Sequence, residues 1–469
     1  MKKRDQWLLL LATSLVNFMS TIDASIVTIA VPQLSHDLRV PMNEAEWVVS
    51  VYLVLICVLL VFFGSLADQI GKIKIFQLGT LIFTVGSLGC GLSTTLGIML
   101  IARILQALGA AMALATNFAI ITQLFPLNKR GLALGVNSAF GQIGNIMGPG
   151  LGGLLLATLS WHAIFFINVP LGIVIYLFGH RVFPKEIRQT AAVKMDFKGF
   201  VVYAAMIVSF FVGVYWGQAI GFNQIRILGL FLLALFCGVL FVWREYHTEK
   251  PLINLKIFKN RGFSIGVLTT ILIFAVGYFN NMILPFYLQE TLHFSAAISG
   301  LILMATPLLN VVSAPLGGTL GDRIGSERIS FYALFLFILP ELIFCLIQPA
   351  WGISWLLVAL MTFGFANGTF QNNPMIMSNA EAQYQGIAGS LAALARNLGM
   401  AIGLSLATSV LYLGISQKAG RHMTSYPTHH ARWFVEGMHL SYGVSFSLLL
   451  LSMGLLGWLL ASRKHTFSK

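Results

Sequence analysis

The chain has 469 residues, of which 57% are apolar and only 10% are charged, and its mean hydropathy is +0.83. A soluble protein carries about a quarter charged residues, so this composition excludes a soluble globular fold and indicates a polytopic membrane protein. The formal net charge of +13 does not indicate nucleic-acid binding, because the basic residues are spread over short segments between apolar runs.

Apolar runs along the whole chain are long enough to cross a hydrocarbon core of about 30 Å as helices of about 20 residues. The runs are continuous rather than alternating, which favours helices over a β-barrel. We therefore expect an all-α membrane protein with fourteen transmembrane spans. The predicted spans are residues 7–32, 45–67, 73–93, 97–121, 132–157, 162–180, 199–217, 225–243, 263–288, 296–320, 329–347, 353–377, 385–413 and 437–461.

The distribution of Lys and Arg predicts the orientation of these spans. Of the 29 basic residues, 22 lie in the two tails and in the loops on the side of the termini or at the span edges beside them, five lie in the opposite loops or at their span edges, and two lie well inside spans. Because loops rich in Lys and Arg stay in the cytoplasm, both termini are expected there.

Two charged residues lie inside the first and fourth spans. A helix that begins near Trp7 and rises about 1.5 Å per residue places Asp23 roughly 24 Å into the membrane. Arg103 enters from the other side near Gly97 and lies about 9 Å from the outer face by the same rise. The two residues are therefore expected at one depth, where a charge is costly and faces a cavity or a partner. They form either a functional site or a static buried ion pair that fixes helix packing.

One short pattern occurs twice. GSLADQIGKIK at residues 64–74 returns as GTLGDRIGSER at residues 318–328, which aligns Asp68 with Asp322 at two helix ends. Each acid can pair with bases or with a helix N-terminus and so hold one arrangement of helices; a solvated turn is the alternative. The repeat predicts two related six-helix bundles separated by two inserted helices, a design of transporters that bind substrate near the midplane. The expected parts are residues 1–185, 186–255 and 256–469.

Four local patterns together resemble the major facilitator superfamily, and within it the fourteen-helix drug:proton antiporters. The segment that begins at Gly64 is similar to the G-x-L-A-D-R-x-G-R-[RK] signature, with Gln69 and Ile73 in place of usual bases. Residues 144–153 are similar to the G-x-x-x-G-P-x-x-G-G signature of exporters. TIDASIVTIAVP in the first span and RILQALGAA in the fourth also fit the family.

This resemblance implies a major facilitator fold and a proton-coupled antiporter that exports amphipathic drugs across the bacterial cytoplasmic membrane by alternating access, with a role in antibiotic resistance. A dedicated exporter of a lipid, siderophore or metabolite is the alternative. The implied partners are a small amphipathic substrate, protons and membrane lipid, and the expected state is a monomer. A membrane-embedded transferase and a passive facilitator are the other rivals; neither an enzyme activity nor nucleic-acid binding is expected. No cofactor or metal is expected, and the proton gradient is the expected energy source.

Proton coupling is expected at Asp23, Arg103 and Glu341. Desolvation favours a neutral Asp23 whereas a nearby guanidinium favours its carboxylate, so separation of the pair would exchange a proton. Glu341 lies near the midplane by rise per residue; alternatively, Pro340 turns it toward lipid headgroups. The expected gating residues are Gly64, Asp68, Gly71, Lys72, Asp322 and Arg323, and the antiporter motif consists of Gly144, Gly148, Pro149, Gly152 and Gly153.

Polar side chains within spans need partners and tend to face inward, which makes several of them candidates for the substrate cavity. Arg396, near the midplane of the thirteenth span, either contacts an anionic substrate or satisfies carbonyl groups near two glycines. The four cysteines all fall inside spans without metal-ligand spacing, so neither zinc nor a disulfide is expected. The cavity candidates are Gln106, Asn280, Asn281, Gln371, Asn372 and Arg396.

Overall fold

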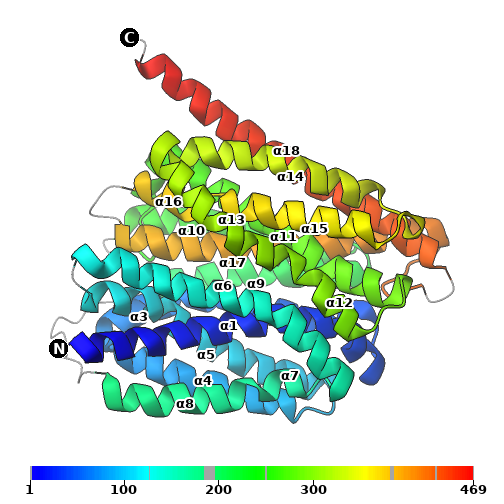
Figure 1. The fold of residues 1–469 in the computed structure, drawn as a ribbon, viewed down its shortest axis with the longest axis horizontal. Helices are drawn as coiled ribbons and strands as arrows, with labels where there is room; N and C mark the ends of the chain where they lie inside the picture. The colour runs from blue at the N-terminus through cyan, green and yellow to red at the C-terminus, as the bar shows by residue number, and fades with distance from the viewer. Residues whose placement is uncertain are drawn as a thin grey trace. The chain divides into compact units, whose positions relative to one another are not determined.

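The computed structural model describes residues 3–125, 127–183, 196–248, 251–380, 385–427 and 430–467, and the regular elements of these residues are all helical (Figure 1). Within these ranges, thirteen helical segments are long and apolar enough to cross a membrane. A further long helix, α6 (Leu127–Thr158), has 32 residues and is long enough at 1.5 Å per residue, but its many glycine and amide residues lower its hydropathy. The predicted all-α transmembrane architecture is confirmed.

The chain forms two compact units, Met1–Asn254 and Leu255–Lys469. The first unit therefore includes the two helices that follow the sixth span; the separate insert at residues 186–255 stays a prediction. The helices of the first unit are α1 (Lys3–Asp37), α2 (Met42–Ala45), α3 (Trp47–Ile70), α4 (Lys72–Gly91), α5 (Leu96–Leu124), α6 (Leu127–Thr158), α7 (Ala163–Phe166), α8 (Asn168–Val182), α9 (Phe197–Ile220) and α10 (Ile225–His247).

The second unit begins with a short 3₁₀ turn and contains several helices that are broken into two pieces within one apolar segment. For example, a π-helical turn, η2, directly extends α11. The elements of the second unit are η1 (Leu255–Lys259), α11 (Arg261–Phe286), η2 (Tyr287–Thr291), α12 (Ala296–Leu303), α13 (Ala305–Ile324), α14 (Ser326–Leu346), η3 (Pro349–Trp351), α15 (Ile353–Thr369), α16 (Asn372–Ser378), α17 (Gln385–Ala419) and α18 (Ala431–Phe467).

The repeated pattern forms the same turn in both units. A single residue, Gly71, separates α3 from α4 with φ of 110°, and Gly325 separates α13 from α14 with φ of 95°. Residues with a Cβ rarely adopt such positive φ values. The glycine that follows the repeated acid, Gly71 after Asp68 and Gly325 after Asp322, therefore allows two membrane helices to follow each other with one residue between them.

A row of glycines brings α6 against α1 (Figure 1). A Cβ at Gly144 or Gly148 would collide with side chains and backbone of α1, and Gly152 lies equally close to isoleucines of that helix. Gly399 and Gly403 on α17 pack in the same way against the backbone of α11 in the second unit. Small residues at such positions let membrane helices approach closely, so each unit contains one closely packed helix pair of the same kind.

The hairpin of α9 and α10 packs on α3. The Tyr203 hydroxyl donates to the Cys57 carbonyl at 3.1 Å, and the rings of Trp47 and Tyr215 lie 4.8 Å apart. The far side of α10 exposes a continuous apolar face. At least 64% of each side chain of that face is exposed; its residues are Leu232, Leu235, Phe236 and Val239. This face is suited to contact with lipid.

Asp196 and Arg244 close one end of this hairpin. The Arg244 guanidinium donates two hydrogen bonds from Nε and one from Nη2 to the Asp196 carboxylate, which also accepts from the Gly199 amide and so caps α9. Burial acts to raise the pKa of Asp196, but the Arg244 and Gly199 hydrogen bonds outweigh it and hold that pKa below its usual value. The ion pair thus fastens the ends of the two helices together.

Candidate functional site

Asp23 lies at the centre of a buried polar cluster in the first unit. Its Oδ2 atom accepts a hydrogen bond from Arg103 Nη1 at 2.8 Å. Its Oδ1 atom accepts from Gln106 Nε2 at 2.9 Å and from Asn168 Nδ2 at 2.8 Å. None of these four side chains is more than 1% exposed. A carboxyl group that accepts from three donors is bonded as an ionised carboxylate, because a protonated acid would have to donate from one of its oxygens.

Arg103 is also satisfied on its other sides. Its Nε atom donates to the Val48 carbonyl at 2.8 Å, and Nη1 donates to Gln106 Oε1 as well as to Asp23. The guanidinium carbon lies 4.6 Å from the centre of the Tyr52 ring and 5.4 Å from that of Phe165. Cation–π contacts of this kind stabilise a desolvated cation. The charge of Arg103 is therefore held by one carboxylate, two oxygen acceptors and two aromatic faces.

Local features of α4 and α5 position these side chains. Arg103 and Gln106 are three residues apart on α5, so they lie on one face of the helix. Gly86 of α4 touches the backbone of Gln106, where a Cβ would collide with it, and this approach lets Gln106 Nε2 donate to Ser87 Oγ at 2.8 Å. The Asp23–Arg103 cluster, consisting of Asp23, Ser87, Arg103, Gln106 and Asn168, thus joins α1, α4, α5 and α8.

The equal depth predicted for Asp23 and Arg103 is matched by direct contact in the structure. Gln106, predicted as a cavity residue, belongs to the same cluster. Sequence reasoning missed Asn168 and Ser87. Asn168 was detectable as an amide inside the apolar stretch WHAIFFINVPLG, but its partner Asp23 is 145 residues away.

Glu341 lies in the second unit and has separate surroundings. It sits on α14, is 0% exposed, and neither carboxyl oxygen makes a hydrogen bond of good geometry with another described residue. Ser445 and Tyr442 of α18 are its polar neighbours. The Tyr442 hydroxyl donates to Asn280 Oδ1 at 2.8 Å, so Asn280 is tied to the polar interior of this unit.

The remaining cavity candidates do not form one cluster among the described residues. Asn281 is exposed, and the Gln371 side chain packs beside Gly317. Arg396 on α17 is half-buried and has no hydrogen bond or ion pair with a described residue. The side chain of Asn372 lies outside the described part of the structure.

The gating residues lie at the one-residue turns. Gly71 forms the first turn and Lys72 begins α4, whereas the space around the backbone of Gly64 is open. Asp322 and Arg323 are exposed at the end of α13. Asp68 falls within α3, but its side chain lies outside the described residues. Of the other two residues of the antiporter motif, Pro149 lies inside α6 and Gly153 is buried.

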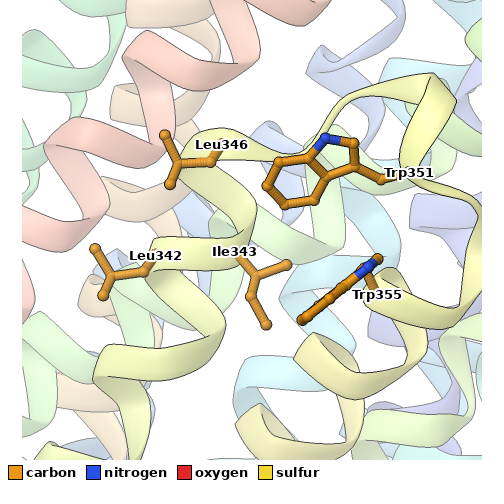
Figure 2. A pocket seen from close by; sticks show the side chains of 5 residues that line it. All are labelled: Leu342, Ile343, Leu346, Trp351 and Trp355. Atoms are coloured by element: carbon orange, nitrogen blue, oxygen red, sulfur yellow. The ribbon is translucent and has the colours of Figure 1, made fainter.

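An apolar groove of ≈ 370 Å³ lies where α14 ends and α15 begins (Figure 2). Figure 2 shows the two indole rings of Trp351 and Trp355 turned toward the side chains of Ile343 and Leu346. Leu346 and both tryptophans are more than 40% exposed. Tryptophan is enriched where a membrane meets water, so this groove has the character of a lipid contact near the end of the helices rather than of a polar substrate site.

Comparison with known proteins identifies the family. A family model of the Major Facilitator Superfamily matches residues 13–404. The chain belongs to this superfamily. The resemblance that the sequence motifs indicated is confirmed, and the protein is a multi-pass membrane protein of a transporter family.

Superfamily members with different substrates resemble this chain over most of its length. The riboflavin transporter RibZ of Clostridioides difficile (strain 630) is 32% identical, covering 90% of this chain and 92% of RibZ. The multidrug resistance protein Stp of Mycobacterium tuberculosis (strain CDC 1551 / Oshkosh) is 28% identical over 90% of this chain and 78% of its own. Among solved structures, a bacterial homologue of the human lysosomal transporter Spinster matches with a TM-score of 0.66 at 15% identity, covering 99% of this chain and 98% of that one, which supports the shared fold.

Proposed function

We propose that this superfamily member is a proton-coupled antiporter that exports amphipathic compounds across the bacterial cytoplasmic membrane by alternating access. The observation that carries the proposal is the ion pair of Asp23 with Arg103, fully buried within a bundle of membrane helices. Ionisable residues at such depth are costly and are commonly part of ion or proton pathways. The name of the relative Stp, a multidrug resistance protein, supports the substrate class.

In this proposal the proton and the guanidinium compete for Asp23. Both oxygens of the Asp23 carboxylate accept hydrogen bonds in the observed arrangement, Oδ2 from Arg103 Nη1 and Oδ1 from two amides. A proton that binds Asp23 removes the negative charge that holds Arg103. Arg103 retains its contacts with the Val48 carbonyl and with the Tyr52 and Phe165 rings. Protonation would therefore remove the ion pair between α1 and α5 without leaving the arginine unpartnered, and deprotonation would restore the pair.

The one-residue turns at Gly71 and Gly325 are proposed to serve as gates, with Asp68, Lys72 and Asp322 pairing in one arrangement and separating in the other. The close packing of α1 on α6 through Gly144 and Gly148 is proposed to re-form in each state. Both termini are proposed to lie in the cytoplasm and the protein to act as a monomer, with the proton gradient as its energy source and without a cofactor.

The test uses protein reconstituted in liposomes with an imposed proton gradient and ethidium as a lipophilic cation. Wild type is expected to release protons when ethidium is added, and Asp23→Asn is expected not to. Asp37→Asn is the matched control, because Asp37 lies at the end of the same helix and is exposed. Equal proton release by wild type and Asp23→Asn would refute the role of Asp23.

A second candidate function is transport of one metabolite rather than many drugs. It is favoured by the similarity to RibZ, a riboflavin transporter, at 32% identity. The same liposomes distinguish the two, since a dedicated metabolite transporter would move labelled riboflavin, or another single metabolite, and would not exchange protons for ethidium or other structurally unrelated cations.

A further inference from the structure

Asp23 and Glu341, both 0% exposed, are held in opposite ways. Asp23 accepts hydrogen bonds from three donors, one of them a guanidinium. Glu341 is equally buried, yet neither of its oxygens has a hydrogen bond of good geometry among the described residues. An ionised carboxylate that is buried without a cation or donors is very costly. The surroundings of Glu341 thus suit a neutral carboxylic acid, whereas those of Asp23 suit a carboxylate.

Glu341 belongs to a regular seam between α14 and α18. His439 Nε2 and the Ile347 carbonyl lie 2.7 Å apart, and the rings of Tyr442 and Phe344 stack with centroids 4.9 Å apart. Successive contacts are three residues apart on each helix, and they run toward the start of α14 and toward the end of α18. The next pair in this register is Glu341 with Ser445. The seam therefore runs from half-buried His439 at one end to the buried acid.

The His439 end of the seam is close to Glu341. Only five residues separate Glu341 from Leu346, where α14 ends, which corresponds to about 8 Å of helix. Fifteen residues, or about 22 Å, separate it from Ser326 at the other end. By the proposed orientation the nearer end faces the outside. A proton from that side has the shorter path to Glu341.

The elements that pack against α14 offer no cation to Glu341 among the described residues. These elements are α13, α15, α16 and α18. α15 and α16 contain no titratable side chain, and Asp322 and Arg323 of α13 lie at its far end, beside the start of α14. The titratable groups that face Glu341 are Tyr442 of α18 and Cys345 of α14 itself.

Charged groups elsewhere on the two helices have their own partners or lie near a helix end. Glu327, in the first turn of α14, accepts from the Asn379 amide at 2.7 Å. Arg432 pairs with Glu436 in the first turns of α18, next to Lys418. Neither pair provides a counter-charge for Glu341.

We propose that Glu341 is a second proton-binding site of the transport cycle, located in the second unit and loaded through the His439 end of the α14–α18 seam. The proposal rests on the proposed proton coupling. In the observed arrangement Glu341 carries the proton and Asp23 is ionised. When the seam opens to the other side, the O–H bond of Glu341 breaks and the proton passes to water, and the carboxylate later takes a new proton from water at the His439 end.

The first measurement is infrared spectroscopy of the protein in a detergent without ester groups, whose carbonyl band would overlap that of a neutral acid. A protonated carboxyl group in an apolar site has a carbonyl stretch that a carboxylate or an amide lacks. We expect wild type to show such a band at neutral pH, and the band to be absent from Glu341→Gln and present in Asp23→Asn. Persistence of the band in Glu341→Gln would overturn the assignment of the proton to Glu341, because another acid would then carry it.

The second measurement is substrate accumulation driven by a gradient of about one pH unit without a membrane potential. Each coupled proton contributes a factor of about ten to the accumulation ratio under this gradient. Glu341→Gln is nearly isosteric with the protonated acid and is expected to fold and to reach a ratio about tenfold lower than wild type. Glu341→Asp, which retains an acid, is expected to recover part of the loss. Glu290→Gln is the control, a half-buried glutamate of the same unit outside the seam.

The outcomes separate this proposal from the proposed function. If wild type accumulates substrate with the pH gradient and Glu341→Gln reaches the same ratio, Glu341 is not a coupling site. In that case the inference about Glu341 fails, whereas the proposed function stands. If wild type shows no dependence on the gradient, the proposed proton coupling fails, and the infrared band then shows whether Glu341 is only a static neutral acid.

Discussion

The Asp23–Arg103 pair predicts an asymmetry between two substitutions that each remove one charge. Asp23→Asn leaves a guanidinium that cannot lose its proton in a protein, whereas Arg103→Met leaves a carboxyl group that can become neutral by taking a proton. Asparagine also has one acceptor oxygen in place of two, so its NH₂ group must face either the Arg103 donor or the amide donors of Gln106 and Asn168. Neither replacement side chain is larger than the native one, so neither variant is expected to cause steric overlap.

The magnitude follows from burial. Asp23 is 0% and Arg103 1% exposed, and removal of one partner from a buried pair costs about 3–5 kcal/mol. We expect Asp23→Asn to reduce the free energy of unfolding by about that much, because the guanidinium that it leaves stays charged. Arg103→Met is expected to reduce it by only about 1–3 kcal/mol, because the carboxyl group that it leaves can become neutral by taking a proton. The double variant Asp23→Asn/Arg103→Met should recover about 2 kcal/mol relative to the sum of the two losses.

The assay is equilibrium unfolding in mixed micelles with increasing denaturing detergent, followed by tryptophan fluorescence. Equal losses of unfolding free energy for the two single variants would refute the asymmetry. If the double variant equalled the sum of the single losses within about 0.5 kcal/mol, the two side chains would not interact energetically, and the buried pair could not act as the switch proposed here.

Three further predictions concern features outside this pair. Gly148→Ala should destabilise the protein by about 1–3 kcal/mol because its Cβ collides with a serine of α1, whereas Gly135→Ala in the same helix meets open space and should be neutral or stabilising; thermal unfolding compares them. Gly325→Ala should cost about 1–2 kcal/mol because φ is 95°, and Gly318→Ala, which meets nothing within 4 Å, should cost little in the same assay. The lowered pKa of Asp196 means that its ion pair stabilises the protein above the unfolded-state pKa of about 3.9 and that this contribution is lost as pH falls through the lower folded-state value. The protection factors of amides at the ends of α9 and α10, which correct for the slower intrinsic exchange in acid, should therefore fall in acid in wild type, whereas in Asp196→Asn they should already be low at neutral pH.

The sequence predicted the depth of charged residues in the membrane better than the direction in which their helix faces point. Rise per residue placed Asp23 and Arg103 at one level, but which faces of α1 and α5 meet depends on how the helices pack, and that is decided by contacts such as the one between Gly86 and the backbone of Gln106. Asn168 could not be assigned because its role comes from a contact with a helix 145 residues earlier. The surroundings of Glu341 were equally hidden, since the seam that encloses it joins α14 to α18 across about a hundred residues of sequence.

Hydropathy also located spans better than helix ends. The last two spans were predicted at residues 385–413 and 437–461, but α17 continues to Ala419 and α18 begins at Ala431. Lys418 of the first helix pairs with Glu436 of the second at 2.8 Å, and Arg432 pairs with the same carboxylate. Polar helical turns that are stabilised by such pairs lie beyond the apolar segment and are invisible to a search for apolar runs.

The attachment of the α9–α10 hairpin to α3 couples movements of the first unit to the surrounding bilayer. The hairpin is fastened to α3 through Tyr203 and Tyr215, and its ends are tied together by Asp196 and Arg244. A tilt of α3 would therefore change the position of the apolar face of α10 in the surrounding lipid. Exposing or burying such a face against a bilayer of unsuitable thickness costs a fraction of a kcal/mol per Å. In the proposed transport cycle, the thickness and stiffness of the membrane would thus enter the energy difference between the conformational states.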